Sequence, residues 1–195
     1  MEIRILQENE MPQALRIARG VFDFCLRKSI SDGQLVNGFM EYASEENFRR
    51  MMQEGALTLW GAFEEGQMVA MSGMQREGHI TMLYVLPVFQ RRGCGKELLL
   101  AMRKYAESKY QLSYVTLNAM PAWTTSYFAK RKFKQMSMLQ GMCPYISMRA
   151  KTIHEVSYET KSVSSGWIIG TSLGGLAVCA AVAIGFMICY MNGIR

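Results

Sequence analysis

Residues 87–96 read PVFQRRGCGK, and this short loop decides how the rest of the chain is interpreted. Before it lies the strand-like apolar run of residues 79–86, and after it the apolar side chains of residues 96–109 recur at helical spacing. The loop therefore joins a strand to the N-terminus of a helix. First-turn amides lack partners inside a helix, and the helix dipole adds partial positive charge there. Because Gly93 and Gly95 let the backbone approach a bound group, the sequence predicts an anion site suited to a pyrophosphate.

The loop differs from the two commonest nucleotide-binding loops. A P-loop needs a Gly-Lys pair followed by Ser or Thr, and the dinucleotide fingerprint needs a third glycine. A turn with two glycines is also found at plain helix entries, so the neighbouring elements have to support the anion site.

Patterns on both sides of the loop predict an α+β fold with a mixed sheet. The order is strand, two helices, three strands, helix, strand, helix, two strands, and it fits one sheet flanked by helices. The expected strands are residues 3–6, 57–63, 68–74, 79–86, 114–118, 133–139 and 145–148, and the expected helices are residues 12–28, 35–53 with a restart at Ser44, 96–109 and 122–131.

Residues 85–99 read VLPVFQRRGCGKELL and resemble the acetyl-CoA motif of the GCN5-related N-acetyltransferase (GNAT) family. The core of that motif is Gln or Arg, two residues, Gly, one residue, then Gly or Ala. The order of elements also resembles that family's order. The resemblance implies a GNAT fold over residues 1–150, acetyl-CoA as cosubstrate, and transfer of an acetyl group to an amine acceptor.

The resemblance also implies where acetyl-CoA binds. Amides of the loop would hold the pyrophosphate, and the preceding strand would pair with the pantetheine arm, whose two amides can add to a strand edge as a peptide does. Asn118 matches a frequent cosubstrate contact of the family, although it could equally be a turn residue at a strand end. The implied cosubstrate-binding residues are Leu83, Tyr84, Val85, Gln90, Arg91, Arg92, Gly93, Cys94, Gly95, Lys96 and Asn118.

Amine acylation needs an acid that protonates the leaving thiolate, and the family commonly uses a tyrosine on the helix after Asn118. Counting nine residues forward from Asn118 reaches Tyr127, whereas counting five back from Phe133 reaches Phe128. The helix thus has one extra residue, and Lys132 replaces its usual terminal glycine. One residue is about 100° of helical rotation. We predict that Tyr127 is the acid; the alternative is a packing tyrosine.

A base must also take a proton from the attacking amine. His79 on the third strand has a suitable pKa range, and Glu77 or Glu41 could act through water. The alternatives are a chain of water molecules and a structural role for His79. His154 is expected to be uninvolved.

The net charge and the cysteine pattern limit which ligands and partners are expected. The net charge of +6 is compatible with an anionic membrane, nucleic acid or a polyanionic cosubstrate. Because the basic runs are short and lack interleaved aromatic residues, no nucleic acid is expected. The five cysteines contain no Cys-x-x-Cys pair, which predicts no metal site.

The C-terminal segment has a different composition from the rest. Residues 162–194 contain no Asp, Glu, Lys or Arg, and residues 167–191 are long enough, at about 37 Å as a helix, to cross a hydrocarbon core of about 30 Å. Trp167 and Tyr190 lie near the two ends, as interfacial aromatic residues do. We predict a linker over residues 151–166 and a transmembrane helix over residues 167–191; the alternative is a buried helix.

The flanking charges predict the orientation of this helix. Arg149, Lys151 and Lys161 precede it and Arg195 alone follows it, so the N-terminal domain is expected in the cytoplasm. Gly170 and Gly174 are spaced to let two such helices pack as a homodimer. The sequence therefore predicts a membrane-anchored acetyltransferase, or alternatively a catalytically inactive, membrane-tethered CoA-binding or interaction protein. It predicts no particular acceptor.

Overall fold

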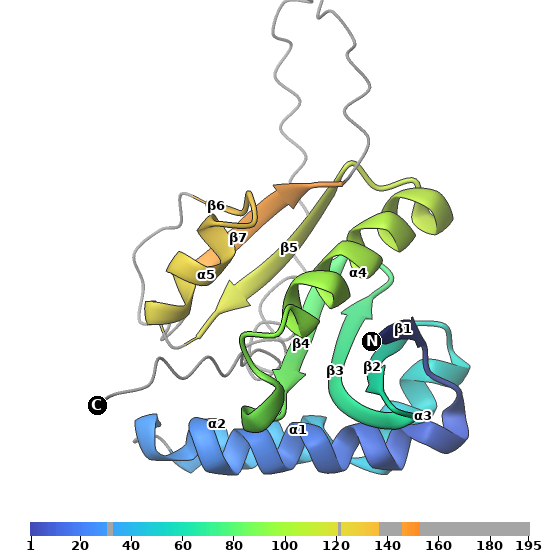
Figure 1. The fold of residues 1–195 in the computed structure, drawn as a ribbon, viewed down its shortest axis with the longest axis vertical. Helices are drawn as coiled ribbons and strands as arrows, with labels where there is room; N and C mark the ends of the chain where they lie inside the picture. Colours follow the sequence, from blue (N-terminus) through green and yellow to red (C-terminus); the bar gives the residue numbers. More distant parts are fainter. Residues whose placement is uncertain (31–32, 121, 137–145, 153–195) are drawn as a thin grey trace, which may run out of the picture.

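The computed structural model describes residues 1–30, 33–120, 122–136 and 146–152, which form a single mixed sheet flanked by helices (Figure 1). Its strand order is β1-β2-β3-β4-β5-β7-β6, and all neighbours are antiparallel except β4 and β5. The expected α+β fold is confirmed. The strands are β1 (Glu2–Ile5), β2 (Leu57–Glu64), β3 (Gln67–Gln75), β4 (His79–Val85), β5 (Tyr114–Ala119), β6 (Lys134–Gln135) and β7 (Ile146–Lys151).

Helices cover both faces of the sheet (Figure 1). The long helices α1 and α4 each contact several strands, from opposite faces. The α-helices are α1 (Met11–Cys25), α2 (Gly33–Tyr42), α3 (Glu45–Gln53), α4 (Cys94–Tyr110) and α5 (Thr125–Ala129), and the 3-10 helices are η1 (Glu8–Glu10), η2 (Arg27–Ser29), η3 (Pro87–Phe89) and η4 (Ala122–Thr124).

The alternation of side chains along β4 separates two hydrophobic cores. Met82 and Tyr84 are buried in the core under α1, α2 and α3. Leu83 and Val85 are buried in the core under α4 and α5. Because β4 is buried on both faces, its side chains hold it in place while one of its backbone edges is left for other contacts.

Local signals set the element boundaries near their expected places. Ser44 caps α3, its hydroxyl accepting a hydrogen bond from Asn47 N at 3.3 Å. The β2–β3 turn has two consecutive left-handed residues, Glu65 and Gly66, which is the geometry that suits a tight hairpin. α4 begins at Cys94, two residues before its expected start, because Gly93 at its N-cap is left-handed with φ of 96°.

The strands β4 and β5 separate shortly after they begin. They pair only where His79 and Ile80 face Thr116 and Leu117, and Figure 1 shows the two strands diverging toward their C-terminal ends. Opposite β3, β4 carries an irregularity at Thr81, since Met74 pairs with Ile80 and Gly73 with Met82. Because β4 and β5 separate, the edge of β4 that faces β5 is unpaired beyond Ile80, in the middle of the sheet.

The predicted transmembrane helix, residues 167–191, lies outside the described residues, as does most of the predicted linker. Within the described part of the chain, no helix is both long and apolar enough to cross a bilayer.

Candidate active site

The N-terminus of α4 presents a row of backbone amides that have no acceptor among the described residues. The amides of Lys96 and Glu97 donate to Gly93 O, at 2.9 and 3.1 Å. The five preceding amides, from Arg91 to Gly95, donate to no described group. Gly93 and Arg91 both have positive φ, which curls the loop so that successive N–H groups converge. This is the geometry of an anion site.

A cleft of about 130 Å³ opens in front of these amides. It lies between β4, the loop before α4, the first turn of α4, and α5. No Asp, Glu or His is among the described residues that line it. They are Leu83, Val85, Phe89, Gln90, Arg91, Gly93, Cys94, Gly95, Lys96, Tyr127 and Arg131.

Tyr127 reaches from α5 to the first turn of α4. A Cβ atom built on Gly95 would lie 2.5 Å from the Tyr127 hydroxyl oxygen, which is far inside contact distance. The next nearest atoms, Cζ of Tyr127 and a methyl carbon of Val85, would be 3.6 and 3.7 Å away. Because Gly95 has no Cβ atom, the Tyr127 hydroxyl can lie against the first turn of α4.

The helix that carries Tyr127 is followed by a left-handed residue that is not glycine. α5 ends at Ala129, Lys132 takes a left-handed φ of 68°, and Phe133 N donates to Phe128 O at 3.1 Å. Lys132 therefore occupies the conformation that a terminal glycine would normally supply. Phe128, the other residue reached by counting, is fully buried in the core between α5 and the sheet.

Arg131 is a site residue that the sequence analysis missed. Its guanidinium carbon lies 3.4 Å from the centre of the Tyr127 ring, and its Nη1 donates to Tyr127 O at 2.7 Å. Phe89 also lines the cleft without having been expected there. Arg131 lies two residues beyond the end of α5, so helical spacing gave no signal for this contact.

The free edge of β4 exposes the backbone of Leu83 and Val85. Leu86 N donates to Val69 O on β3 at 3.0 Å, and because backbone groups alternate in direction, those of Leu83 and Val85 point to the β5 side. Tyr84 was expected to join them. Its backbone points toward β3 instead, and its side chain is fully buried in the other core.

Several expected cosubstrate residues have other contacts. The Gln90 side chain donates from Nε2 to Val85 O at 3.1 Å, which ties the loop to the end of β4. Arg92 lies 3.8 Å from the Glu64 carboxylate and is not among the residues lining the cleft. Asn118 Oδ1 accepts a hydrogen bond from Ser147 Oγ at 2.6 Å and is likewise not among them.

His79 is not close to Tyr127 in this fold. It begins β4, six residues before Val85, which is about 20 Å along an extended strand. Its Nδ1 lies 2.6 Å from Thr116 Oγ1, and burial lowers the pKa of His79 to about 4. Glu77, in the turn before β4, lies at the same remote end of the strand. Direct proton transfer needs a separation of about 3 Å, so neither group reaches the cleft.

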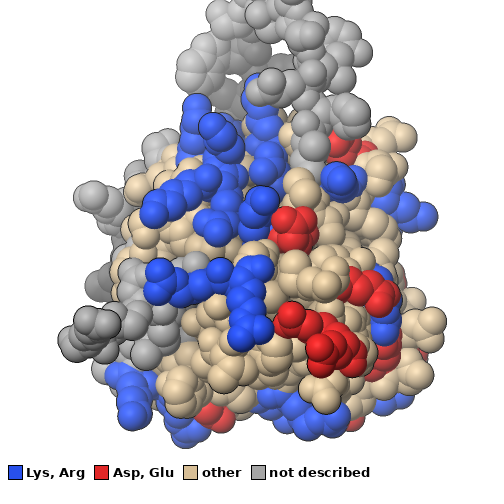
Figure 2. Space-filling view, viewed as in Figure 1, with Lys and Arg blue, Asp and Glu red and all other residues tan. Residues whose placement is uncertain are grey.

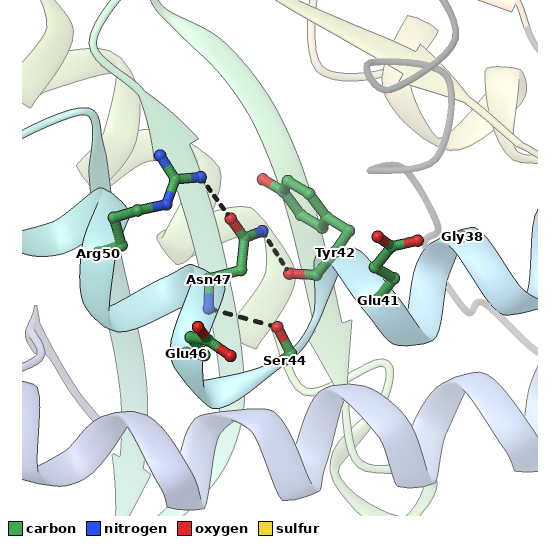
Figure 3. A pocket seen from close by; sticks show the side chains of 7 residues that line it. All are labelled: Gly38, Glu41, Tyr42, Ser44, Glu46, Asn47 and Arg50. Carbon is green, nitrogen blue, oxygen red and sulfur yellow. Dashed lines mark hydrogen bonds between the residues drawn. The ribbon is translucent and has the colours of Figure 1, made fainter.

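A second concave surface lies between α2 and α3 (Figure 3). Glu41, one of the two carboxylates expected to act as the base through water, lines this surface. One hydrogen bond joins the two helices, from Asn47 Nδ2 to Tyr42 O at 2.9 Å, and within α3 Arg50 Nη2 donates to Asn47 Oδ1 at 2.8 Å. Burial raises the pKa of the Tyr42 hydroxyl to about 12. None of the described residues lining this surface also lines the cleft at α4.

Comparison with known proteins identifies the family. Residues 27–149 match the model of the acetyltransferase (GNAT) domain. The chain belongs to the GNAT acetyltransferase family. GNAT enzymes use acetyl-CoA as cosubstrate and acetylate amines, and this chain is a GNAT-family N-acetyltransferase. No curated protein sequence matches it.

Solved structures resemble this GNAT chain in fold. A PaiA N-acetyltransferase from Thermoplasma acidophilum, in complex with coenzyme A, is 19% identical with a TM-score of 0.64, covering 77% of this chain and 99% of its own. An aminoglycoside 6'-acetyltransferase type Ii is 14% identical with a TM-score of 0.58, covering 80% of this chain and 99% of its own. The ribosomal-protein-S18-alanine N-acetyltransferase from Escherichia coli is 19% identical with a TM-score of 0.55, covering 80% and 98%.

The cleft fits the cosubstrate of the family. Free amides and two glycines at the start of α4 suit a pyrophosphate, and the unpaired edge of β4 suits the amides of a pantetheine arm. A Cβ atom at Gly93 would meet nothing within 4 Å, so the loop is open to a ligand on that side.

Proposed function

We propose that this GNAT enzyme transfers the acetyl group of acetyl-CoA to an amine acceptor at the cytosolic face of a membrane. The observation that carries the catalytic part is the Tyr127 hydroxyl lying against Gly95, inside the cleft bounded by Leu83 and Val85. The anchoring part rests on the uncharged apolar run of residues 167–191 and on the cationic residues before it.

Each group of the cleft has a role in this proposal. The amides from Arg91 to Gly95, with the partial positive charge of the α4 N-terminus, bind the pyrophosphate. The backbone of Leu83 and Val85 aligns the pantetheine arm along the free edge of β4. Transfer forms a bond from the acceptor nitrogen to the acetyl carbon and breaks the carbon–sulfur bond.

Tyr127 supplies the proton that the departing thiolate takes up. Its hydroxyl lies against Gly95 at the start of α4, and the stacked guanidinium of Arg131 favours the phenolate that remains. Since no carboxylate or imidazole lines the described cleft, we assign deprotonation of the amine to water. Tyr127 then regains its proton from solvent.

Cosubstrate binding is tested by thermal unfolding of the full chain with and without acetyl-CoA. Acetyl-CoA at a free concentration of about a hundred times its dissociation constant adds about 2.7 kcal/mol to the free energy of unfolding. This raises Tm by several degrees. Gly93→Glu is expected to abolish the rise, because it places a carboxylate among the amides. Gly66→Glu is the matched control: both glycines have positive φ and open space around the missing Cβ. If acetyl-CoA raised Tm equally in both variants, the loop before α4 would not bind the pyrophosphate.

Catalysis is tested separately by turnover of acetyl-CoA with a panel of amines. Tyr127→Phe is expected to lower kcat on the order of 10²-fold while the acetyl-CoA-dependent rise in Tm persists. Tyr114→Phe, which alters a partly exposed hydroxyl on β5, serves as the control. Unchanged kcat in Tyr127→Phe would show that another group protonates the thiolate. An absence of turnover in the parent chain, with acetyl-CoA bound, would favour an inactive CoA-binding protein.

A further inference from the structure

The C-terminal half of the sheet is built from a stretch of chain without acidic residues. Between Ser108 and His154 there is no Asp or Glu, while there are seven Lys or Arg residues. None of the seven forms an ion pair with a carboxylate among the described residues, whereas the observed ion pairs involve cations elsewhere in the fold. These seven residues are Lys109, Lys130, Arg131, Lys132, Lys134, Arg149 and Lys151.

Five of them lie on or beside β6 and β7 and form what we call the basic surface: Lys134, Arg149 and Lys151 extend from the face of these strands opposite α5, and Lys130 and Lys132 follow α5 in the chain. Lys134 on β6 lies directly opposite Arg149 on β7, and both are exposed. Figure 2 shows Lys and Arg side chains concentrated over the part of the molecule where α5, β6 and β7 lie, with Asp and Glu gathered mainly on the other side. The basic surface consists of Lys130, Lys132, Lys134, Arg149 and Lys151.

A helix contact fixes the end of β7 within this surface. Arg103 on α4 donates from Nε to the carbonyl oxygen of Lys151 at 2.9 Å, and burial lowers the pKa of its guanidinium. The last residues of β7 are therefore held against α4 rather than left loose. The backbone that carries Lys151 is thus fixed relative to α4.

The same point of the fold is where the chain continues toward the apolar run. Residues 153–166 are 14 residues long and span at most about 50 Å even when fully extended. Lys151 and Trp167 are 16 residue steps apart, so a bilayer crossed by residues 167–191 would always lie within about 58 Å of Lys151. The cytoplasmic leaflet carries a negative surface potential, and each Lys or Arg near it gains about 1 kcal/mol.

We propose that the basic surface docks on anionic phospholipid headgroups of the membrane that anchors the chain, and thereby fixes the orientation of the catalytic domain. This proposal rests on the anchor of the proposed function. The charge is complementary to the leaflet, the charges have no protein counter-ions among the described residues, and the tether supplies proximity. A nucleic acid would meet the same charge without the tether, so the lipid surface is the partner that these observations favour.

Lysine acylation followed by mass spectrometry tests this docking on the full chain in proteoliposomes. One set of vesicles is phosphatidylcholine alone, and the other contains about one third phosphatidylserine. We expect Lys134 and Lys151 to be acylated several-fold more slowly in the anionic vesicles, while the exposed Lys28 on η2 reacts equally in both. The protection should disappear at about 1 M salt, where the Debye length falls to about 3 Å.

A charge-reversal pair extends the test. Lys134→Glu combined with Lys151→Glu should abolish the slower acylation of Lys130 and Lys132, and Lys28→Glu should leave it intact. Equal acylation of the basic surface in both kinds of vesicle would overturn the proposal. So would equal protection of Lys28, or protection by added RNA that matches or exceeds that by anionic vesicles.

The anchor is read out independently, by alkaline carbonate extraction of the phosphatidylcholine vesicles. If extraction releases the chain, the anchor is wrong, while salt-sensitive protection of Lys134 and Lys151 by anionic vesicles still supports docking. If the chain resists extraction and protection is absent, docking is wrong and the anchor stands. Acetyl-CoA turnover is measured on the same samples. Because turnover reports on catalysis alone, its loss or retention is distinguished from failure of the anchor and from failure of docking.

Discussion

The Tyr127 hydroxyl lies against Gly95 at the anion site, in space that the Cβ atom of any other residue would occupy. In Gly95→Ala the new Cβ would overlap the Tyr127 hydroxyl, which forces the phenol to move. We expect a loss of about 1–3 kcal/mol in the free energy of unfolding, as in other overpacked sites, measured by urea titration without cosubstrate.

The same substitution in a Tyr127→Phe background should behave differently. Without the hydroxyl, the nearest atoms to the new Cβ are 3.6 and 3.7 Å away, which is ordinary contact. Alanine also favours the helix over glycine by about 0.5–1 kcal/mol, so the double variant is expected to match or exceed Tyr127→Phe in stability. Additive effects of the two substitutions would contradict the contact.

His79 gives the protein a specific pH dependence of stability. Its pKa is about 4 in the folded chain against 6.5 when unperturbed, so protonation favours the unfolded chain. Its contribution is complete above pH 6.5 and is lost as pH falls toward 4. Between about pH 7.5 and pH 5 this amounts to about 2 kcal/mol.

His79→Gln should remove that part of the pH dependence, as measured by urea unfolding at the two pH values. Glu10 does not interfere in this window: the hydrogen bond from Arg4 lowers the pKa of Glu10 to about 2, so its contribution is lost only below pH 4.5. The same slope in the variant and the parent chain would show that His79 titrates normally.

The sequence analysis predicted Tyr127 as the acid, although the two residue counts reached Tyr127 and Phe128. Counting forward from Asn118 and counting back from Phe133 gave positions one residue apart, because the segment between them has one extra residue. One residue rotates a helix by about 100°. In the structure the Tyr127 hydroxyl lies beside Gly95, whereas Phe128 is buried in the core. Arg131 was missed because nothing in its spacing distinguishes a cation on an aromatic ring from one in solvent.

At the scale of an element, the end of α5 contains a strained position. Lys132 has φ of 68°, a conformation that costs a residue with a Cβ about 1–2 kcal/mol. Lys132→Gly should relieve it and, after the entropy of glycine in the unfolded chain, add about 0.5–1 kcal/mol to stability. Thermal unfolding measures the gain.

Lys130→Gly is the matched control for that substitution. It also removes an exposed lysine of α5, but φ there is −60°, which is helical. Because glycine disfavours helical backbone, this variant should lose about 0.5–1 kcal/mol. Two variants that shift stability in the same direction would argue against strain at Lys132.

Element boundaries were predictable where local chemistry sets them and less so where tertiary contacts do. The cap at Ser44 and the turn at Gly66 follow from local rules, and both agree with the structure. Tyr84 was grouped with Leu83 and Val85 because a sequence does not reveal which backbone edge of a strand is already paired. That edge is determined by β3, far away in the sequence.

At the scale of the whole molecule, the anchor is the prediction that most affects where the enzyme works. Ala180→Asp combined with Ala181→Asp puts two charges near the centre of residues 167–191, each costing about 2.5–3.5 kcal/mol in a membrane span. We expect the parent chain to resist alkaline carbonate extraction from cell membranes and the double variant to be released. The single substitution Asn192→Asp, beyond the run, should leave the chain resistant.

The overall fold was predictable because the order of elements and the loop at residues 87–96 agreed with one family. The basic surface was not, although its acid-free stretch is visible in the sequence. Lys134 and Arg149 become neighbours only when β6 pairs with β7. A pattern of charge becomes a surface only through such long-range pairing.

The divergence of β4 and β5 also bears on how the protein avoids self-association. Open strand edges are normally templates for pairing with other chains, and proteins usually blunt them at the rim of a sheet. Here the free edge of β4 lies inside the sheet, flanked by β5 and by α4. A pantetheine arm can add to such an edge, while its position inside the sheet keeps it away from the rim, where strands of other molecules pair. The enzyme thereby keeps a permanently open ligand edge without offering one for aggregation.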